Sequence, residues 1–383
     1  MTSRLTIVLL VMLTAGPCLV AQEGPALDLT RSIDSLSAFD YATRMNAARA
    51  VRRAAPSAAV AALTRAVRGH TDQFVRHRAL VLLTSFNDPA TPLLMRSLIG
   101  DRNDRVRETA YRWFERRPDP GLAETLLTAL NTEQAEFVRP ALIRAVAALP
   151  SDDRVQRALT AEAGRGLDFF RSAVIEALGE HRAAYAVPAV AAVADLEGPL
   201  QDDAVLALGR IGDRRAVAAL ASSIGAPQEI APALQAAQCL LGDNCEGRIV
   251  WLAQAARSPA ARPETARAAI AALGVVAAQG QAAALQALMG LANEDAERLR
   301  REATFAFSGV ALRQPEEIIM WLGAAPDDAR ARAIDLLREG FEGLEEDFAE
   351  EYFFAVARAA YWRADEGSAR RTSIATLIDR LEF

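Results

Sequence analysis

Residues 202–224 read DDAVLALGRIGDRRAVAALASSI and contain one complete helix–turn–helix joint. Two alanine-rich segments flank a turn over residues 209–213. Their apolar residues follow the i, i+3, i+7 spacing that buries one stripe of a helix, at positions 205, 208, 217, 220 and 224. Gly212 can end the first helix in the left-handed conformation. Asp213 can then cap the second helix through its side-chain oxygen.

The same joint recurs about every 32 residues along the chain. With Gly209 as the reference, the matching positions are Arg52, Thr84, Glu115, Pro150, Gly179, Gly209, Gly242, Gly274, Gly309 and Arg338. A period of this size with two helices per unit is typical of an α-solenoid. The sequence therefore predicts an all-α fold, a right-handed solenoid of about ten two-helix repeats.

A second periodic marker is an arginine that follows Val or Phe, at Arg76, Arg107, Arg139 and Arg171. An acid lies three residues before three of them, at Asp104, Glu136 and Asp168. The D/E-x-x-V-R-x-x-A and L-G-x-x-G-D patterns resemble HEAT repeats of the short, phycobilisome-lyase type, over roughly residues 30–340. We interpret the acids as helix caps and the arginines as a structural ladder between units.

The chain is expected to begin with a targeting segment. Residues 1–21 combine a positive start, an apolar run and a cleavage site after Ala21, which together predict a signal peptide. The mature protein would be periplasmic or secreted, and Pro17 before Cys18 disfavours a lipoprotein anchor. The remaining divisions are a linker over 22–29, the repeats over 30–340 and C-terminal capping helices with an acidic face over 341–383.

Two cysteines remain after the signal peptide is removed. Cys239 and Cys245 flank a helix end and a turn. In an oxidising compartment they could form a disulfide, and the alternative is one buried and one exposed thiol.

Composition and motifs point away from catalysis and from nucleic-acid binding. The net charge of −6 disfavours general nucleic-acid binding, which needs a basic surface. None of the three histidines is followed by an acid, and zinc-type clusters and a nucleophile elbow are missing, so we predict no catalytic residue, cofactor or metal ligand. The uncharged stretch 268–292 is interrupted by Gln279 and Gln281, which predicts two buried helices and no membrane span.

Charge is distributed unevenly between the two ends. Residues 42–117 contain 15 arginines against six acids, whereas residues 339–351 contain seven acids and no base. Both could be ordinary solvated helix surfaces, and the acidic one fits a capping helix. The sharper hypothesis is that the basic end recruits an acidic partner by electrostatic attraction.

The expected function is that of an exported, non-catalytic scaffold. Its concave, partly arginine-rich surface, formed by the second helix of each unit, would bind a protein partner. The candidate partner-binding residues are Arg49, Arg52, Arg78, Arg107 and Arg112. Two alternatives stay open: self-association in the envelope through the oppositely charged ends, and a lyase- or carrier-type enzyme related to bilin lyases.

Overall fold

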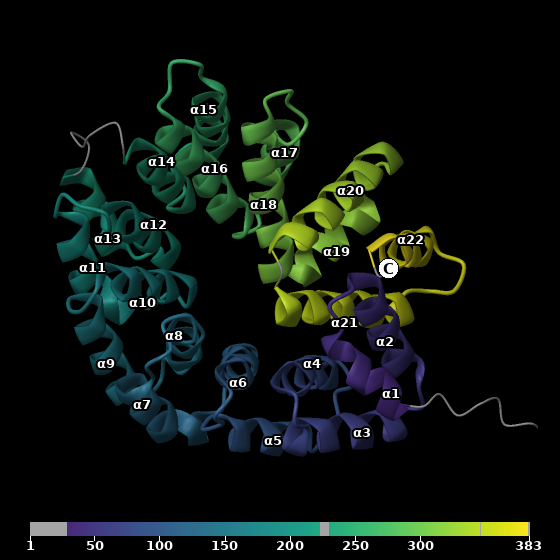
Figure 1. Ribbon diagram of the computed structural model, residues 1–383. Helices are drawn as coiled ribbons and strands as arrows, with labels where there is room; N and C mark the ends of the chain where they lie inside the picture. The colour runs from purple at the N-terminus through teal and green to yellow at the C-terminus, as the bar shows by residue number, and fades with distance from the viewer. Residues whose placement is uncertain (1–28, 223–229, 345, 382–383) are drawn as a thin grey trace, which may run out of the picture.

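The computed structural model describes residues 29–222, 230–344 and 346–381, and every regular element in these ranges is helical (Figure 1). The all-α solenoid expected from the sequence is confirmed. The predicted signal peptide, nearly all of the linker and Ile224 lie outside the described residues.

Successive helices alternate between an outer and an inner layer (Figure 1). The outer layer contains α3 (Pro56–Gly69), α5 (Thr91–Leu98), α7 (Ala123–Thr132), α9 (Asp153–Ala163), α11 (Val187–Ala194), α13 (Arg214–Ser222), α15 (Cys245–Arg257) and α17 (Ala282–Leu291). The inner layer contains α4 (Gln73–Thr84), α6 (Asp104–Arg116), α8 (Arg139–Ala147), α10 (Asp168–Glu180), α12 (Gln201–Ile211), α14 (Ala231–Leu240), α16 (Pro263–Ala277) and α18 (Glu297–Arg313).

The remaining helices lie at the two ends of the chain. The N-terminal end is formed by α1 (Leu29–Asp34) and α2 (Tyr41–Arg53). The C-terminal end is formed by α19 (Pro315–Ala324), α20 (Asp327–Leu344), α21 (Asp347–Arg363) and α22 (Ala369–Leu381). The expected boundary of the capping region at residue 340 therefore falls inside α20.

The joint around residue 212 forms much as its sequence suggests. Gly212 ends α12 with a φ of 71°, and the Asp213 carboxylate accepts a hydrogen bond of 2.8 Å from the backbone N–H of Arg215 in α13. Val205, Leu208 and Leu220 are buried. The side chain at position 217 is not among those the structure describes.

The turn itself is shorter than predicted, because Gly209 belongs to α12. A Cβ atom on Gly209 would lie 2.5 Å from the Cα atom of Ala237 in α14. A Cβ atom on Gly179 in α10 would lie 2.9 Å from the Cα atom of Ala207 in α12. Here the periodic glycine marks the closest approach of neighbouring inner helices rather than a turn.

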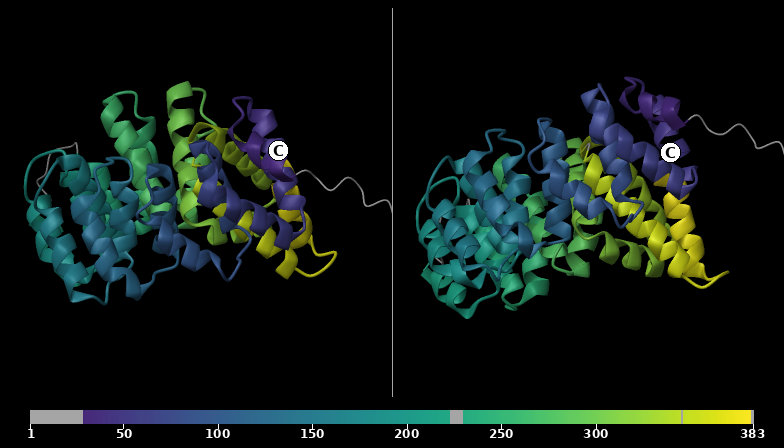
Figure 2. Two further views of the ribbon diagram at one scale, coloured as in Figure 1. Left: turned by 60° about the horizontal axis from the view of Figure 1, so that its bottom comes forward. Right: turned by 90° about the horizontal axis from the view of Figure 1, so that it is seen from below.

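The solenoid curves until its two ends meet. Helix α21 packs against α4 as well as against α18 and α19, and Figures 1 and 2 show the purple N-terminal helices beside the yellow C-terminal ones from three directions. Phe348 of α21 is buried in the core cluster of the N-terminal half, whereas Phe353 and Phe354 belong to the cluster of the C-terminal half. The molecule is therefore a closed ring with α21 across its opening.

We expect Gly209→Ala to destabilise the ring by about 1–3 kcal/mol, because the added methyl group overpacks the α12–α14 contact. The matched control is Gly309→Ala in α18, where an added Cβ meets nothing within 4 Å. That substitution should be neutral or stabilising by up to about 1 kcal/mol, since alanine favours helix more than glycine does. Thermal unfolding followed by circular dichroism measures the stability of both variants. Equal changes in stability would contradict the close approach of α12 and α14 at Gly209.

Candidate functional site

The closing seam is the contact of the acidic start of α21 with the arginines of α2, α4 and α6. We define it by three ion pairs: Arg52–Glu351, Arg78–Asp347 and Arg112–Glu346. The arginines come from three consecutive inner-facing helices near the N-terminus, and the acids lie within six residues of one another at the other end of the sequence. The solenoid curvature thus joins segments more than 230 residues apart.

Glu351 is the most enclosed residue of the seam. It is 3% exposed. Its carboxylate accepts a hydrogen bond of 3.2 Å from Arg52 Nε and one of 3.0 Å from Arg358 Nη2. A buried carboxylate needs such charge-assisted donors, because removal from water is costly for an unpaired anion. The two guanidinium groups therefore make the burial of Glu351 possible.

The other two seam pairs are partly exposed. Arg78 Nη1 lies 3.5 Å from Asp347 Oδ1, and Arg112 Nη1 lies 2.5 Å from Glu346 Oε2. Arg112 also contacts Glu108 of its own helix at 2.9 Å. Partly exposed pairs of this kind contribute less than buried ones, since water and salt screen them.

Contacts other than ion pairs extend the seam. Arg116 Nη2 donates a hydrogen bond of 2.9 Å to the Leu312 carbonyl of α18, and its guanidinium lies 4.1 Å from the centre of the Tyr352 ring. The side chain of Phe348 is buried in the core cluster of the N-terminal half. Closure thus combines apolar burial with charge complementarity.

The five arginines selected from the sequence have different surroundings. Arg52, Arg78 and Arg112 lie at the seam and contact acids of the same chain. Arg107 binds Glu133 through two hydrogen bonds of 2.8 Å each. Arg49 donates to Asn46 of its own helix at 3.2 Å. The structure therefore brings three of the five together.

The predicted solvated face of the C-terminal acids is wrong for Glu351, and Glu346 and Asp347 pair with arginines of the same chain. Glu345 lies outside the described residues. The charge asymmetry was visible in the sequence, but the sequence could not show that the solenoid bends far enough for its own ends to meet. Opposite charges that could have attracted another molecule here attract each other.

Both kinds of pair expected for the periodic arginines occur, with an acid of the next unit and with the acid three residues earlier. Arg76 pairs with Asp101 at 2.5 Å and 3.1 Å, and Arg107 pairs with Glu133. Each acid lies 25 or 26 residues further along, in the loop before the next inner helix. Arg171 instead pairs with Asp168, three residues before it, at 3.1 Å. The ladder links neighbouring units, which is a structural role.

A second polar group lies inside the ring, next to the seam. Arg313 of α18 contacts Glu176 at 3.2 Å and Glu180 at 3.1 Å, both on α10 across the ring. A cavity of about 240 Å³ lies beside these residues and is lined also by Arg112, Arg144 and Phe348. Sequence spacing gave no signal for these contacts, because the residues are 133 and 137 positions apart.

Two groups at the seam have strongly shifted pKa values. Burial raises the pKa of Glu350 from 4.5 to about 8, and the nearby Asp347 carboxylate adds to the shift. Burial lowers the pKa of His77 to about 4, an effect that Asp347 opposes and Arg78 reinforces. At neutral pH Glu350 is therefore protonated and His77 is uncharged. The seam therefore carries less negative charge at neutral pH than the number of its acids suggests.

Cys239 and Cys245 form a disulfide in the structure. Their Cα atoms are 4.0 Å apart, and the bond joins the end of α14 to the start of α15 across a turn. In the described part of the chain, no three His, Cys, Asp or Glu side chains are grouped so as to hold a metal ion. None of the helices described there is long and apolar enough to cross a membrane.

We expect Glu351→Gln to loosen the closing seam. The change leaves Arg52 and Arg358 without their anion, and removing one member of a buried ion pair typically costs about 3–5 kcal/mol. Hydrogen–deuterium exchange should become faster in α21, and the radius of gyration from small-angle scattering should increase. Glu339→Gln removes the same charge from an exposed position in the same acidic stretch and should change neither measurement. Unchanged exchange in both variants would exclude a closing role for Glu351.

We also expect the contribution of Glu350 to the stability of the ring to fall as pH rises from about 4.5 to about 8, whereas buried His77 contributes in the opposite direction below about pH 6.5. The raised pKa of Glu350 means that the folded chain binds more protons than the unfolded chain in this window, so stability is lost as pH rises. Glu350→Gln should remove this component and should be more stable than the wild type above about pH 8. Urea unfolding at several pH values measures the free energy of unfolding of the wild type and of Glu350→Gln. Parallel dependence on pH in the two proteins would contradict the contribution assigned to Glu350.

Comparison with known proteins agrees with the repeat architecture. A family model described as HEAT repeats matches residues 31–113. A comparison with curated proteins finds no match.

Several solved structures are similar in fold. The CpcE–CpcF complex of phycocyanin lyase from Nostoc sp. PCC7120 is 19% identical, with a TM-score of 0.42, over 66% of this chain and 96% of that one. Importin beta is 13% identical, with a TM-score of 0.39, over 92% of this chain and 55% of that one. Kap121p bound to Nup53p is 16% identical, with a TM-score of 0.39, over 92% of this chain and 41% of that one. The chain thus spans about half the length of importin beta and less of Kap121p.

These likenesses concern the fold alone. The family match covers the first repeats, and the same alternation of outer and inner helices continues beyond it through α18. Residues 31–113 are therefore similar to HEAT repeats, and the described chain as a whole is an all-α solenoid.

Proposed function

We propose that the protein is an exported, non-catalytic scaffold that binds an acidic protein partner through the arginine-lined inner surface of α2, α4 and α6. HEAT repeats generally mediate protein–protein binding. The proposal adds an acidic partner and a defined surface to this general property.

The observation that carries the proposal is the acidic helix already seated on this surface. Arg52, Arg78 and Arg112 extend from three successive helices toward one acidic segment, and Phe348 adds an apolar anchor. A surface that holds one acidic, amphipathic helix has the charge and the apolar pocket to hold another. A partner helix of the same character would have to displace α21. The stability of the seam would therefore limit the affinity for that partner.

Export is part of the proposal and is supported by two sequence features. Residues 1–21 have the pattern of a signal peptide, and the Cys239–Cys245 disulfide fits an oxidising compartment. Sequencing the N-terminus of the mature protein tests it directly, since cleavage after Ala21 would leave Gln22 as the first residue.

Self-association through the charged ends gains no support from the structure. The acids and arginines that would join two copies already contact each other within one chain.

The proposal is tested by affinity capture from the native envelope fraction with tagged residues 22–383. We expect a stoichiometric partner whose recovery decreases with salt, because exposed charges are screened beyond about 8–10 Å at physiological ionic strength. Glu351→Gln should increase its recovery, since the competing helix is loosened. Replacing Arg52, Arg78 and Arg112 by Gln should abolish it.

The control replaces three exposed arginines outside the seam, Arg65, Arg68 and Arg102, by Gln. This variant loses the same charge and should capture the partner as the wild type does. Equal loss of partner recovery in both triple variants would show that binding depends only on net charge. Equal recovery by the wild type and both triple variants would exclude the inner surface as the binding site.

A further inference from the structure

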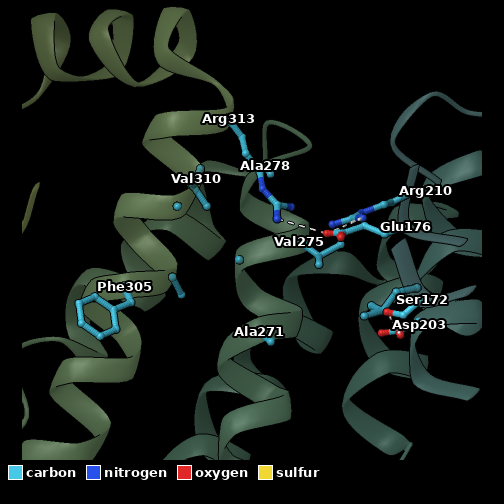
Figure 3. Close-up of a pocket in the computed structure, with 14 residues that line it drawn as sticks. Ser172, Glu176, Asp203, Arg210, Ala271, Val275, Ala278, Phe305, Val310 and Arg313 are labelled. Atoms are coloured by element: carbon cyan, nitrogen blue, oxygen red, sulfur yellow. Dashed lines mark hydrogen bonds and ion pairs between the residues drawn. The ribbon is translucent and has the colours of Figure 1, made fainter. Parts of the chain in front are cut away.

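A cavity of about 390 Å³ lies inside the ring between α10, α12, α16 and α18 (Figure 3). Its volume falls within the range of about 300–1,000 Å³ that is usual for small-molecule sites. One side carries polar groups from α10 and α12, and the opposite side is formed by small and apolar residues of α16 and α18 together with Arg313 at the end of α18. The cavity is separate from the closing seam.

Arg210 is the unusual residue of this cavity. It is 7% exposed, and its guanidinium points toward the space that also receives Glu176 and Arg313 (Figure 3). Its nearest ionic contact is Glu176, 4.0 Å from Nη1, which is beyond hydrogen-bond distance. Its buried Nε has no hydrogen-bond partner among the described residues. A buried guanidinium with unmet donors is costly, which indicates that an acceptor belongs beside it.

The acids near Arg210 make their closest contacts elsewhere. Glu176 accepts a hydrogen bond of 3.2 Å from Arg313. Asp203 accepts one of 2.6 Å from the Ser172 hydroxyl. Burial lowers the pKa of Arg210, an effect that nearby carboxylates oppose, and raises the pKa of Asp203. Arg210 therefore has carboxylates near it but no acceptor at hydrogen-bond distance.

The wall opposite Arg210 is suited to an apolar group. Val275 of α16 and Val310 of α18 line it, together with Ala271 and Ala278. We propose that this cavity binds a small monocarboxylate with an apolar body, whose carboxylate accepts hydrogen bonds from Arg210 and whose body packs against Val275 and Val310.

The charges around the cavity select the class of ligand. A guanidinium presents parallel N–H donors that match the two oxygens of a carboxylate. Glu176 and Asp203 also line the space, so a ligand with two negative charges, such as a phosphate monoester, would be repelled more strongly than a monoanion. A neutral amide of the same shape would keep the apolar contacts but lose the charge-assisted bonds.

The test measures binding to residues 22–383 by isothermal titration calorimetry. Octanoate is the probe, and octanamide is the uncharged compound of the same shape. Octanoate should bind at least ten times more tightly than octanamide. Arg210→Met, which keeps an unbranched apolar stem but removes the guanidinium, should weaken octanoate binding at least tenfold. Ala271→Leu fills the cavity from an exposed position of α16 and should weaken both compounds.

The control is Arg300→Gln, which removes an exposed arginine outside the cavity lining and should leave octanoate binding unchanged. Binding of octanoate that survives both Arg210→Met and Ala271→Leu would show adsorption to other apolar surface and would overturn the proposal. The absence of octanoate binding to the wild type would overturn it as well.

Stability provides a second readout that needs no ligand. If Arg210 is retained for binding, the ligand-free Arg210→Met protein should have a higher Tm than the wild type, because it no longer buries a guanidinium that lacks a hydrogen-bond acceptor. A lower Tm would assign Arg210 to the structural ion pairs of the ring and would count against the proposed site.

Discussion

The seam between α21 and the N-terminal inner helices determines the shape of this molecule. A HEAT solenoid is normally stabilised between neighbouring units, so that its ends are free to move apart. Here Glu351 is buried between Arg52 and Arg358, and Phe348 is packed into the core of the opposite end. These long-range contacts turn a chain of local interactions into a closed ring.

Curvature, which brings the ends together, depends on how closely the inner helices pack. At Gly179 and Gly209 the absence of a side chain allows the neighbouring helix to approach within a distance that a Cβ atom would prevent. The Arg76–Asp101 and Arg107–Glu133 pairs then fix the position of each unit relative to the next. Small residues and the arginine ladder thus have a geometric function that a single repeat does not reveal.

Closure also creates an interior that an open solenoid would expose to water. Arg313 reaches Glu176 and Glu180 across the ring, and Arg210 remains buried without a hydrogen bond within the described chain. A fold selected for stability alone would replace such a residue by an apolar one. The seam and the cavity therefore carry the two proposed binding properties, one for a protein segment and one for a small anion.

The sequence by itself determined the helical repeat, because apolar spacing, the left-handed Gly212 and the Asp213 cap are local features with local consequences. It also showed the charge asymmetry of the two ends and placed Cys239 and Cys245 six residues apart, a separation that allows a disulfide but does not require it. Only the tertiary structure decided that the acidic and basic ends meet, that Gly209 serves helix packing, and that Arg210 faces a cavity. Such properties depend on curvature summed over many units, and no short stretch of sequence specifies that sum.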